Sequence, residues 1–190
     1  ALYSNTTASS NIAVGGNALF ANTTGANNTA SGYGSLTANT TGSYNAAFGH
    51  DTLDVNTTGS YNTGMGRATL SENTTGQFNS ASGYVSLLNN TTGQKNTGSG
   101  AYSGVNLTTG IENTFIGYNA GGTFTTGSNN VCVGYDAGGS STTEINSLWL
   151  ARNSGNANSS GVWVYGDASG RCYQGNNSSS WSTTSDERIK

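Results

Sequence analysis

Charged residues are scarce in this sequence. Only 8% of its 190 residues are Asp, Glu, Lys or Arg, whereas an ordinary globular domain has roughly a quarter. The formal net charge is −3, and the few cations are scattered along the chain. Because nucleic acids and anionic membranes are recognised by clustered basic side chains, this pattern argues against both as partners.

Other familiar signals are missing as well. No apolar run is long enough to span a bilayer, so we expect no membrane insertion, and no secretory signal peptide is visible. The two cysteines, Cys132 and Cys172, are too few for a disulfide framework, and Cys132 is expected to be a small buried apolar side chain. Gly, Asn, Thr and Ser take the place of the missing charged residues. Such a composition, without a repeating order, would suggest disorder.

Residue sets that carry chemistry are also absent. His50 is the only histidine, so no catalytic set with a second base can be assembled. The pair His50 and Asp51 has no further ligands at a plausible spacing for a metal. Gly-x-Gly patterns such as Gly98-Ser99-Gly100 precede no helix that could receive a phosphate. We therefore expect no enzyme, no metal and no cofactor.

A repeat of 17 residues organises most of the chain, and Asn56–Leu70 is a clear copy of it. A turn glycine, an asparagine and a second glycine recur at this spacing without an insertion. Such regularity indicates a solenoid rather than disorder. The asparagine column comprises Asn11, Asn28, Asn45, Asn62, Asn79, Asn96, Asn113 and Asn130.

Each repeat predicts one coil of an all-β parallel solenoid, with the shaft at residues 1–140. The Asn-Thr-Thr-Gly segment suits a type I turn. A short strand is expected from each column asparagine to the second glycine, as in Asn62–Gly66, and a looser segment ending in a leucine such as Leu70 follows. Seventeen residues suffice for two short strands and two turns, and no helical period appears.

The two faces of the expected strand differ in side-chain size. The second position after the asparagine is small, as in Ala30 and Ala47, while the third is often larger and apolar. Alternation places these positions on opposite faces, and a coil of 17 residues encloses too little volume to cover both. We therefore expect a parallel homo-oligomer whose axis is lined by Val14, Phe48, Met65, Ile116 and Val133.

The asparagine column is expected to face inward. Stacked at the strand spacing of about 4.8 Å, its amides can hydrogen-bond from coil to coil. The segment Asn-Thr-Thr also spells a glycosylation sequon, for example at Asn22 and Asn39. A turn explains its regular recurrence, whereas glycosylation does not.

The period ends near residue 140, and the preceding coils change their filling. The leucine column becomes glycine while apolar residues enter other columns, so apolar volume moves around the coil. These changes are at Gly104, Leu107, Phe115, Ile116, Gly121, Phe124 and Gly138.

A strand at Ser147–Ala151 and a hairpin formed by Val162–Tyr165 and Arg171–Gln174 are expected beyond the shaft. They would build a terminal knob at residues 141–184. Trp149 and Trp163 would form its core, with a sugar-stacking platform as the alternative.

The repeats resemble those of bacteriophage tail fibres, as in Asn113-Thr114-Phe115-Ile116-Gly117-Tyr118-Asn119-Ala120-Gly121. They are also similar to the head repeats of trimeric autotransporter adhesins. Both families form homotrimeric left-handed β-rolls, so the resemblance implies a homotrimer.

The segment 185–190, Ser-Asp-Glu-Arg-Ile-Lys, looks like the opening of the intramolecular chaperone domain that follows many such fibres. That domain trimerises the fibre and then cuts itself off between the Ser and the Asp. The resemblance therefore implies a cleavage junction at Ser185 and Asp186. A cleaved product would stop at Ser185, whereas this chain continues through Lys190.

These resemblances imply a structural phage tail fibre in the virion tail, with a host-surface receptor or glycan as partner. A trimeric adhesin of a bacterial surface is the nearest alternative. An ice-binding solenoid is a third, because threonines such as Thr24 and Thr41 form ladders, although only one threonine per coil would face out. The first repeat begins without a cap, so we expect these residues to belong to a longer protein.

Overall fold

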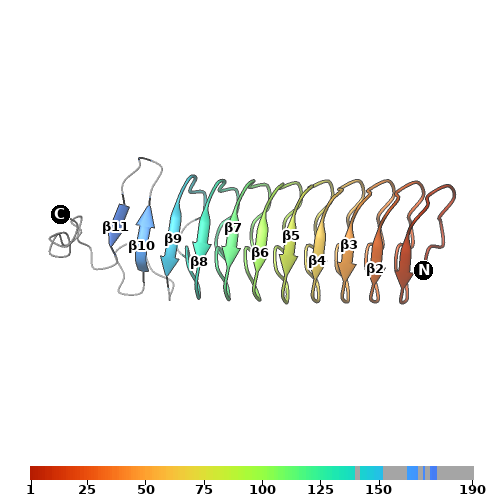
Figure 1. Cartoon of the computed structure of the whole chain (residues 1–190), viewed down its shortest axis with the longest axis horizontal. Coiled ribbons are helices and arrows are strands. Elements are labelled where there is room, and N and C mark those ends of the chain that lie inside the picture. The colour runs from red at the N-terminus through yellow and green to blue at the C-terminus, as the bar shows by residue number, and fades with distance from the viewer. Residues whose placement is uncertain (140–141, 152–161, 167–168, 170–171, 175–190) are drawn as a thin grey trace, which may run out of the picture.

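The computed structural model describes residues 1–139, 142–151, 162–166, 169 and 172–174. Within these residues the chain is all-β and has no helix, and its strands follow one another along an elongated body (Figure 1). The strands are β1 (Ile12–Val14), β2 (Thr29–Ser31), β3 (Ala46–Phe48), β4 (Thr63–Met65), β5 (Ser80–Ser82), β6 (Thr97–Ser99), β7 (Thr114–Ile116), β8 (Val131–Val133), β9 (Leu148–Ala151), β10 (Val162–Gly166) and β11 (Cys172–Gln174).

Strands β1 to β9 form one parallel sheet in which each residue pairs with the residue one repeat later. In β3 and β4, for example, Ala47 pairs with Gly64 and Phe48 with Met65. The register does not slip over the shaft, so the predicted β-solenoid with 17-residue coils is confirmed. The strands are shorter than expected, with three residues in each of β1 to β8, and the rest of each repeat is turns and bends.

The coil closes through residues in the left-handed backbone region. Leu53 and Leu70 have φ angles of 54° and 53°, and Tyr61 has a φ of 60°. This conformation costs a non-glycine residue about 1 kcal/mol, so sequence rules reserve it for Gly and Asn. Leucine adopts it here because the bend directs its side chain into the core, where Leu53 and Leu70 are completely buried.

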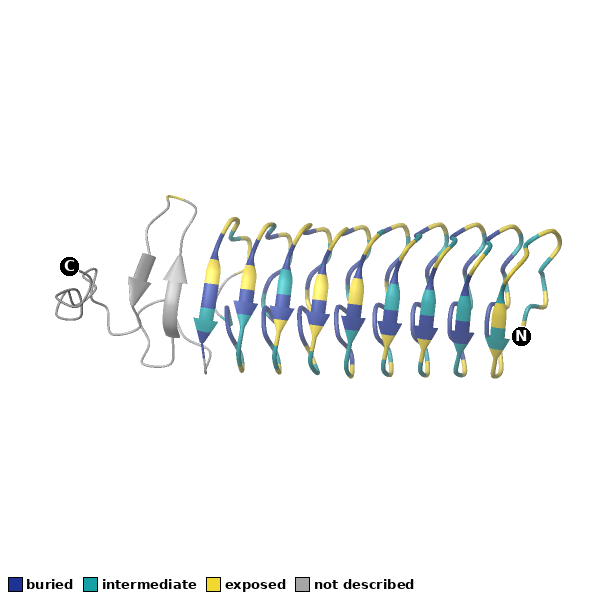
Figure 2. Cartoon of the chain, in the orientation of Figure 1, coloured by how far each residue is buried: buried dark blue, intermediate teal, exposed yellow. Residues whose placement is uncertain are grey.

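The core is a narrow column that runs the length of the shaft. It contains the second residue of most strands together with the leucine that ends the looser segment and, in the first coil, the alanine before that leucine. Figure 2 shows the buried centres of β2 to β9 in dark blue. Its members in the first coils are Ala18, Leu19, Ala30, Leu36, Ala47, Leu53, Leu70, Ala81 and Leu87.

The core changes its filling in the last coils. Phe115 takes the strand position that alanine holds earlier and is completely buried. Its ring occupies the space of the leucine column, because a Cβ added to Gly121 would lie 2.7 Å from Phe115 Cγ. Leu107 and Phe124 replace turn asparagines, and the rings of Phe124 and Phe115 are 5.6 Å apart. Apolar volume is therefore exchanged between columns.

This exchange predicts a rescue experiment. Phe115→Ala is expected to cost about 3 kcal/mol of unfolding free energy because it leaves a cavity. Gly121→Leu alone is also destabilising, since the new side chain meets the Phe115 ring. The double variant should recover much of the loss, because the φ of 64° at Gly121 is close to that of the buried leucines. Urea denaturation of the three variants measures the coupling, and additive losses would contradict the exchange.

The sheet changes direction after β9. β10 runs antiparallel to both neighbours, with Tyr165 opposite Trp149 of β9 and Tyr173 of β11. The sheet order therefore continues unbroken from β1 to β11, and the three last strands alternate in direction.

Candidate functional site: the outer face of the strands

The asparagine column lies inside the coil. Seven of its members, Asn28 to Asn130, are at most 1% exposed, while Asn11 at the first rung is partly buried. Asn62 shows the pattern: its Nδ2 donates to Gly76 O at 2.8 Å, and its Oδ1 accepts from the backbone N–H of Asn79 at 3.0 Å. Each amide thus joins neighbouring coils and satisfies backbone groups that the core would otherwise leave unpaired.

A second asparagine ladder was not predicted from the sequence. The turn asparagines Asn22, Asn39, Asn56, Asn73 and Asn90 are completely buried. Asn56 Nδ2 donates to Asn39 Oδ1 at 2.8 Å and to Gly59 O at 3.0 Å. The predicted turn explains only the second of these bonds. Because the amides are inside the fold, these sequons are inaccessible in the folded chain.

This second ladder ends where the core changes. Leu107 occupies the rung after Asn90 and has no side-chain amide to donate. Asn90 Oδ1 therefore has no hydrogen-bond partner among the described residues. The strict repetition of the turn asparagine is therefore explained by its contact with the next coil, in addition to the turn itself.

The first and third residues of each strand point outward. The third position carries the residues predicted to line an oligomer axis, and four of them are well exposed: Val14 (60%), Phe48 (44%), Met65 (46%) and Ile116 (43%). Val133 is half-buried. We call the outward side of β1 to β9 the outer strand face; Figure 2 shows lighter colours at the ends of most strands.

Aromatic side chains flank this face on both sides. Tyr44, Tyr61 and Phe78, two residues before β3 to β5, stack in one row with ring centroids 4.9 Å apart. Two residues after their strands, Tyr118 and Tyr135 stack at 5.3 Å. All five rings are exposed. The outer strand face is therefore bordered by one aromatic row beside β3 to β5 and by another beside β7 and β8, neither of which was predicted from the sequence.

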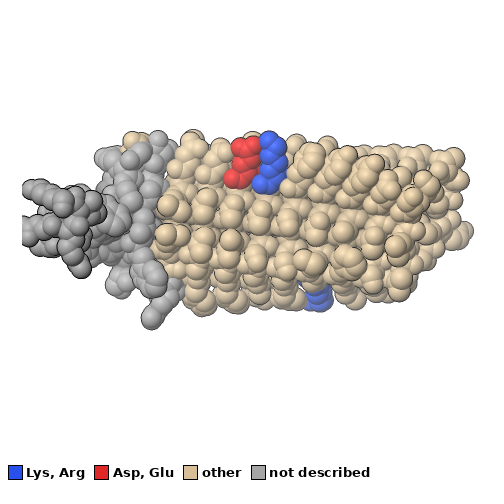
Figure 3. All heavy atoms as spheres, in the orientation of Figure 1, with Lys and Arg blue, Asp and Glu red and all other residues tan. Residues whose placement is uncertain are grey.

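Charge contributes little to this side of the molecule. One neighbouring red and blue pair stands out in Figure 3. An exposed ion pair joins Lys95 Nζ to Glu112 Oε1 at 2.8 Å across neighbouring coils, and such pairs contribute at most about 1 kcal/mol. The side chains on the outer strand face are thus apolar or hydroxyl-bearing.

No reactive or metal-binding cluster occurs in the part of the chain that the structure describes. His50 Nδ1 lies 2.7 Å from Asp51 Oδ2, but no group of three metal-ligating side chains surrounds them there. Cys132 is buried as expected. Burial, and to a smaller extent the charge of Glu144, raises the pKa of the Cys132 thiol far above its usual range, so it stays protonated.

The remaining sequence-predicted residues are at the C-terminal end. Trp149 is 2% exposed and packs in the core, so its ring offers no surface for sugar stacking. Ser185 and Asp186 lie outside the described residues, and so does the side chain of Trp163.

The chain matches no family model, no curated protein and no solved structure. Among the described residues, no helix has the length and apolar character needed to cross a membrane.

Proposed function

We propose that this chain is the shaft of a homotrimeric fibre of the phage tail-fibre type. The observation that carries the proposal is the row of exposed apolar side chains on the outer strand face, including Val14, Phe48 and Met65. Apolar patches of this kind mark interaction surfaces. The parallel strands stay in register, so these side chains stack in one column, in which Ser31, Ser82 and Ser99 separate the apolar rungs. The column runs along the whole shaft, so it suits a partner that does the same.

Further copies of the same chain fit this requirement. In a parallel arrangement about one axis, each rung meets its own equivalent, so Met65 faces Met65 and Phe48 faces Phe48. Closed symmetric arrangements give every copy the same environment. The number of three chains comes from the resemblance to tail fibres and trimeric adhesins.

The bonding pattern supports a mechanical role. Consecutive coils are joined by strand hydrogen bonds, by two asparagine ladders and by a threonine ladder in which Thr57 Oγ1 donates to Thr74 O at 3.1 Å. Many parallel bonds must break together before the shaft extends. A fibre of this kind would hold an attachment tip away from a virion tail, or from a bacterial surface in the adhesin alternative. In this proposal a following chaperone domain releases the fibre between Ser185 and Asp186.

Met65→Asp tests the trimer. It would place three carboxylates together at the axis, at a cost of several kcal/mol of assembly free energy. Sedimentation velocity should show a trimer for the natural chain and a monomer for this variant. Thr58→Asp is the matched control, because Thr58 is exposed on a turn away from the strands and should leave the trimer intact. A natural chain that sediments as a stable, folded monomer would refute the proposal.

A further inference from the structure

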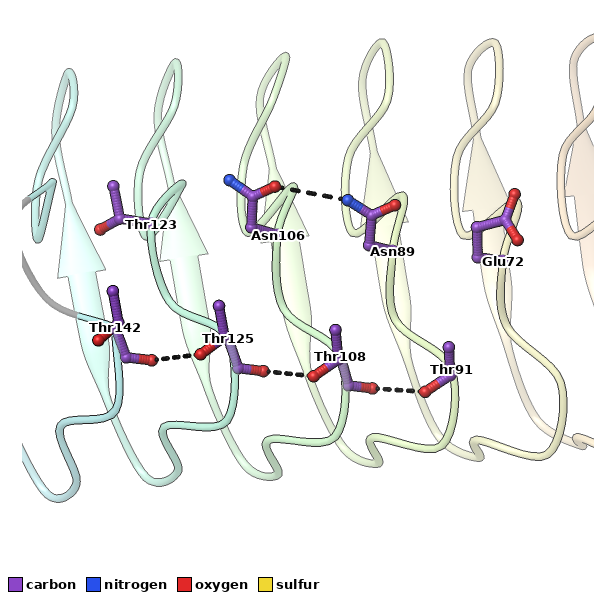
Figure 4. A pocket seen from close by; sticks show the side chains of 8 residues that line it. All are labelled: Glu72, Asn89, Thr91, Asn106, Thr108, Thr123, Thr125 and Thr142. Carbon is purple, nitrogen blue, oxygen red and sulfur yellow. Dashed lines mark hydrogen bonds between the residues drawn. The ribbon is translucent and has the colours of Figure 1, made fainter.

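A shallow, open groove lies on the wall of the coil opposite the strands. Its volume is about 630 Å³, and it runs over several coils in the C-terminal half of the shaft. In Figure 4 the strands pass behind it. Two rows of side chains border it, and they differ in chemistry.

The first row consists of threonines. Thr91, Thr108 and Thr125 each donate Oγ1 to the carbonyl oxygen of the threonine one coil later, at 2.9 to 3.1 Å. Figure 4 shows that their methyl carbons point toward the other row. With the hydroxyls engaged along the ladder, this side of the groove presents a strip of methyl groups.

The second row is polar over four successive coils. It contains Glu72, Asn89, Asn106 and Thr123, whereas the same column holds Ala21, Ala38 and Val55 in the three coils before them and Ser4 in the first coil. The threonine row does not change in the same way, since Thr40, Thr57 and Thr74 precede Thr91. The repeat therefore accommodates both apolar and polar residues at this column, and the polar side chains give these coils a surface that the coils just before them lack.

The polar row keeps unused hydrogen-bonding capacity. An amide has two donor hydrogens and two acceptor lone pairs. Asn106 Nδ2 donates to Gly122 O at 2.6 Å, and Asn89 Nδ2 reaches Asn106 Oδ1 only at 3.5 Å. Both amides can donate and accept further bonds, and the exposed carboxylate of Glu72 can accept bonds at the end of the row.

The groove excludes two classes of ligand. No Lys or Arg lines it, so it lacks the donors that phosphate and other anions require. Its backbone is already paired, since the N–H groups of Thr91, Thr108 and Thr125 donate to the next coil. An extended peptide would therefore find no open strand edge to join.

We propose that this groove binds a neutral linear glycan lying along the long axis of the shaft. The C–H surface of the sugar chain would pack on the threonine methyl groups, and its hydroxyls would bond to Asn89, Asn106 and Glu72. Hydroxyls, like amides, both donate and accept, so the two surfaces match. The groove is complete within one chain and does not depend on the trimer, although such binding would give the proposed fibre an attachment surface.

The test uses calorimetric titration of the full chain with cellohexaose, maltohexaose and chitohexaose, and with hexagalacturonate as the anionic comparison. At least one neutral sugar should bind, and hexagalacturonate should not. Asn89→Ala with Asn106→Ala should weaken binding about tenfold or more, through the loss of at least two hydrogen bonds. Alanine is compatible with the fold at this column, as Ala21 and Ala38 show.

Thr92→Ala with Thr109→Ala is the matched control, because both threonines are exposed in the same coils but do not line the groove. This variant should bind as the natural chain does, and circular dichroism checks that both variants are folded. No binding of any neutral sugar, preferential binding of hexagalacturonate, or equal losses in both variants would overturn the proposal. Sedimentation of the same samples reports the trimer separately, so failure of the groove and failure of the fibre are distinguishable.

Discussion

Gly66→Ala is expected to disrupt the middle of the shaft and to cost more than about 4 kcal/mol of unfolding free energy. Gly66 follows β4 with a φ of +132°, a conformation that side chains rarely adopt. An added Cβ would lie 2.5 Å from the carbonyl oxygen of Gly83 in the next coil. Because the obstacle is backbone that is itself bonded to Met65, it cannot rotate away as a side chain could.

The matched control for this variant is Gly16→Ala. Gly16 is exposed and not in the left-handed region, and its added Cβ would meet only the Tyr33 ring, at 3.0 Å. A flexible exposed ring can move, so we expect a change within about 1 kcal/mol. Urea denaturation followed by circular dichroism compares the two. Equal stability of Gly66→Ala and the natural chain would show that the backbone of Gly66 does not lie in close contact with the backbone of the next coil.

Asn62→Asp is expected to destabilise the shaft by about 4 kcal/mol at neutral pH. The substitution replaces the Nδ2 donor with an oxygen that faces the carbonyl of Gly76, 2.8 Å away in the natural chain. It also puts a charge at a site that is completely buried. Asn27→Asp is the control, since Asn27 is exposed and its φ of 59° is similar to that of Asp51.

The Asn62→Asp variant should also gain a pH dependence. Burial without a cation disfavours the charged form, so the pKa of the new carboxyl in the folded state lies above its unfolded value of about 3.9. Proton binding then favours folding: the protonated acid can donate to Gly76 O, and this stability is fully present below the unfolded pKa and is lost as pH rises through the folded pKa. The free-energy gap to the natural chain should therefore be smaller at acidic pH than at pH 7. A gap of the same size at both would contradict a buried ladder.

The sequence by itself determined the architecture of the shaft. Three columns at one spacing require that equivalent residues stack, because only stacked coils place every copy in the same environment. The alternation of small and large residues then predicted which strand side faces the core. For that reason the inward position of Asn62 and the outward position of Met65 could both be predicted without coordinates.

The tertiary structure alone decided how each coil closes and what surrounds it. Leucine at a positive φ and the burial of Asn56 contradict or exceed local rules. The sequence predicted that apolar volume moves between columns, but only the structure shows the Phe115 ring in the space beside Gly121. The aromatic row of Tyr44, Tyr61 and Phe78 and the groove beside Asn106 are likewise contacts between residues of different coils. Local propensity describes a residue and its chain neighbours, whereas in this protein the stabilising contacts of each side chain are made chiefly with the coils before and after it. Those contacts exist only once the chain has stacked, and their free energy exceeds the backbone cost of about 1 kcal/mol that local rules assign to the left-handed leucines.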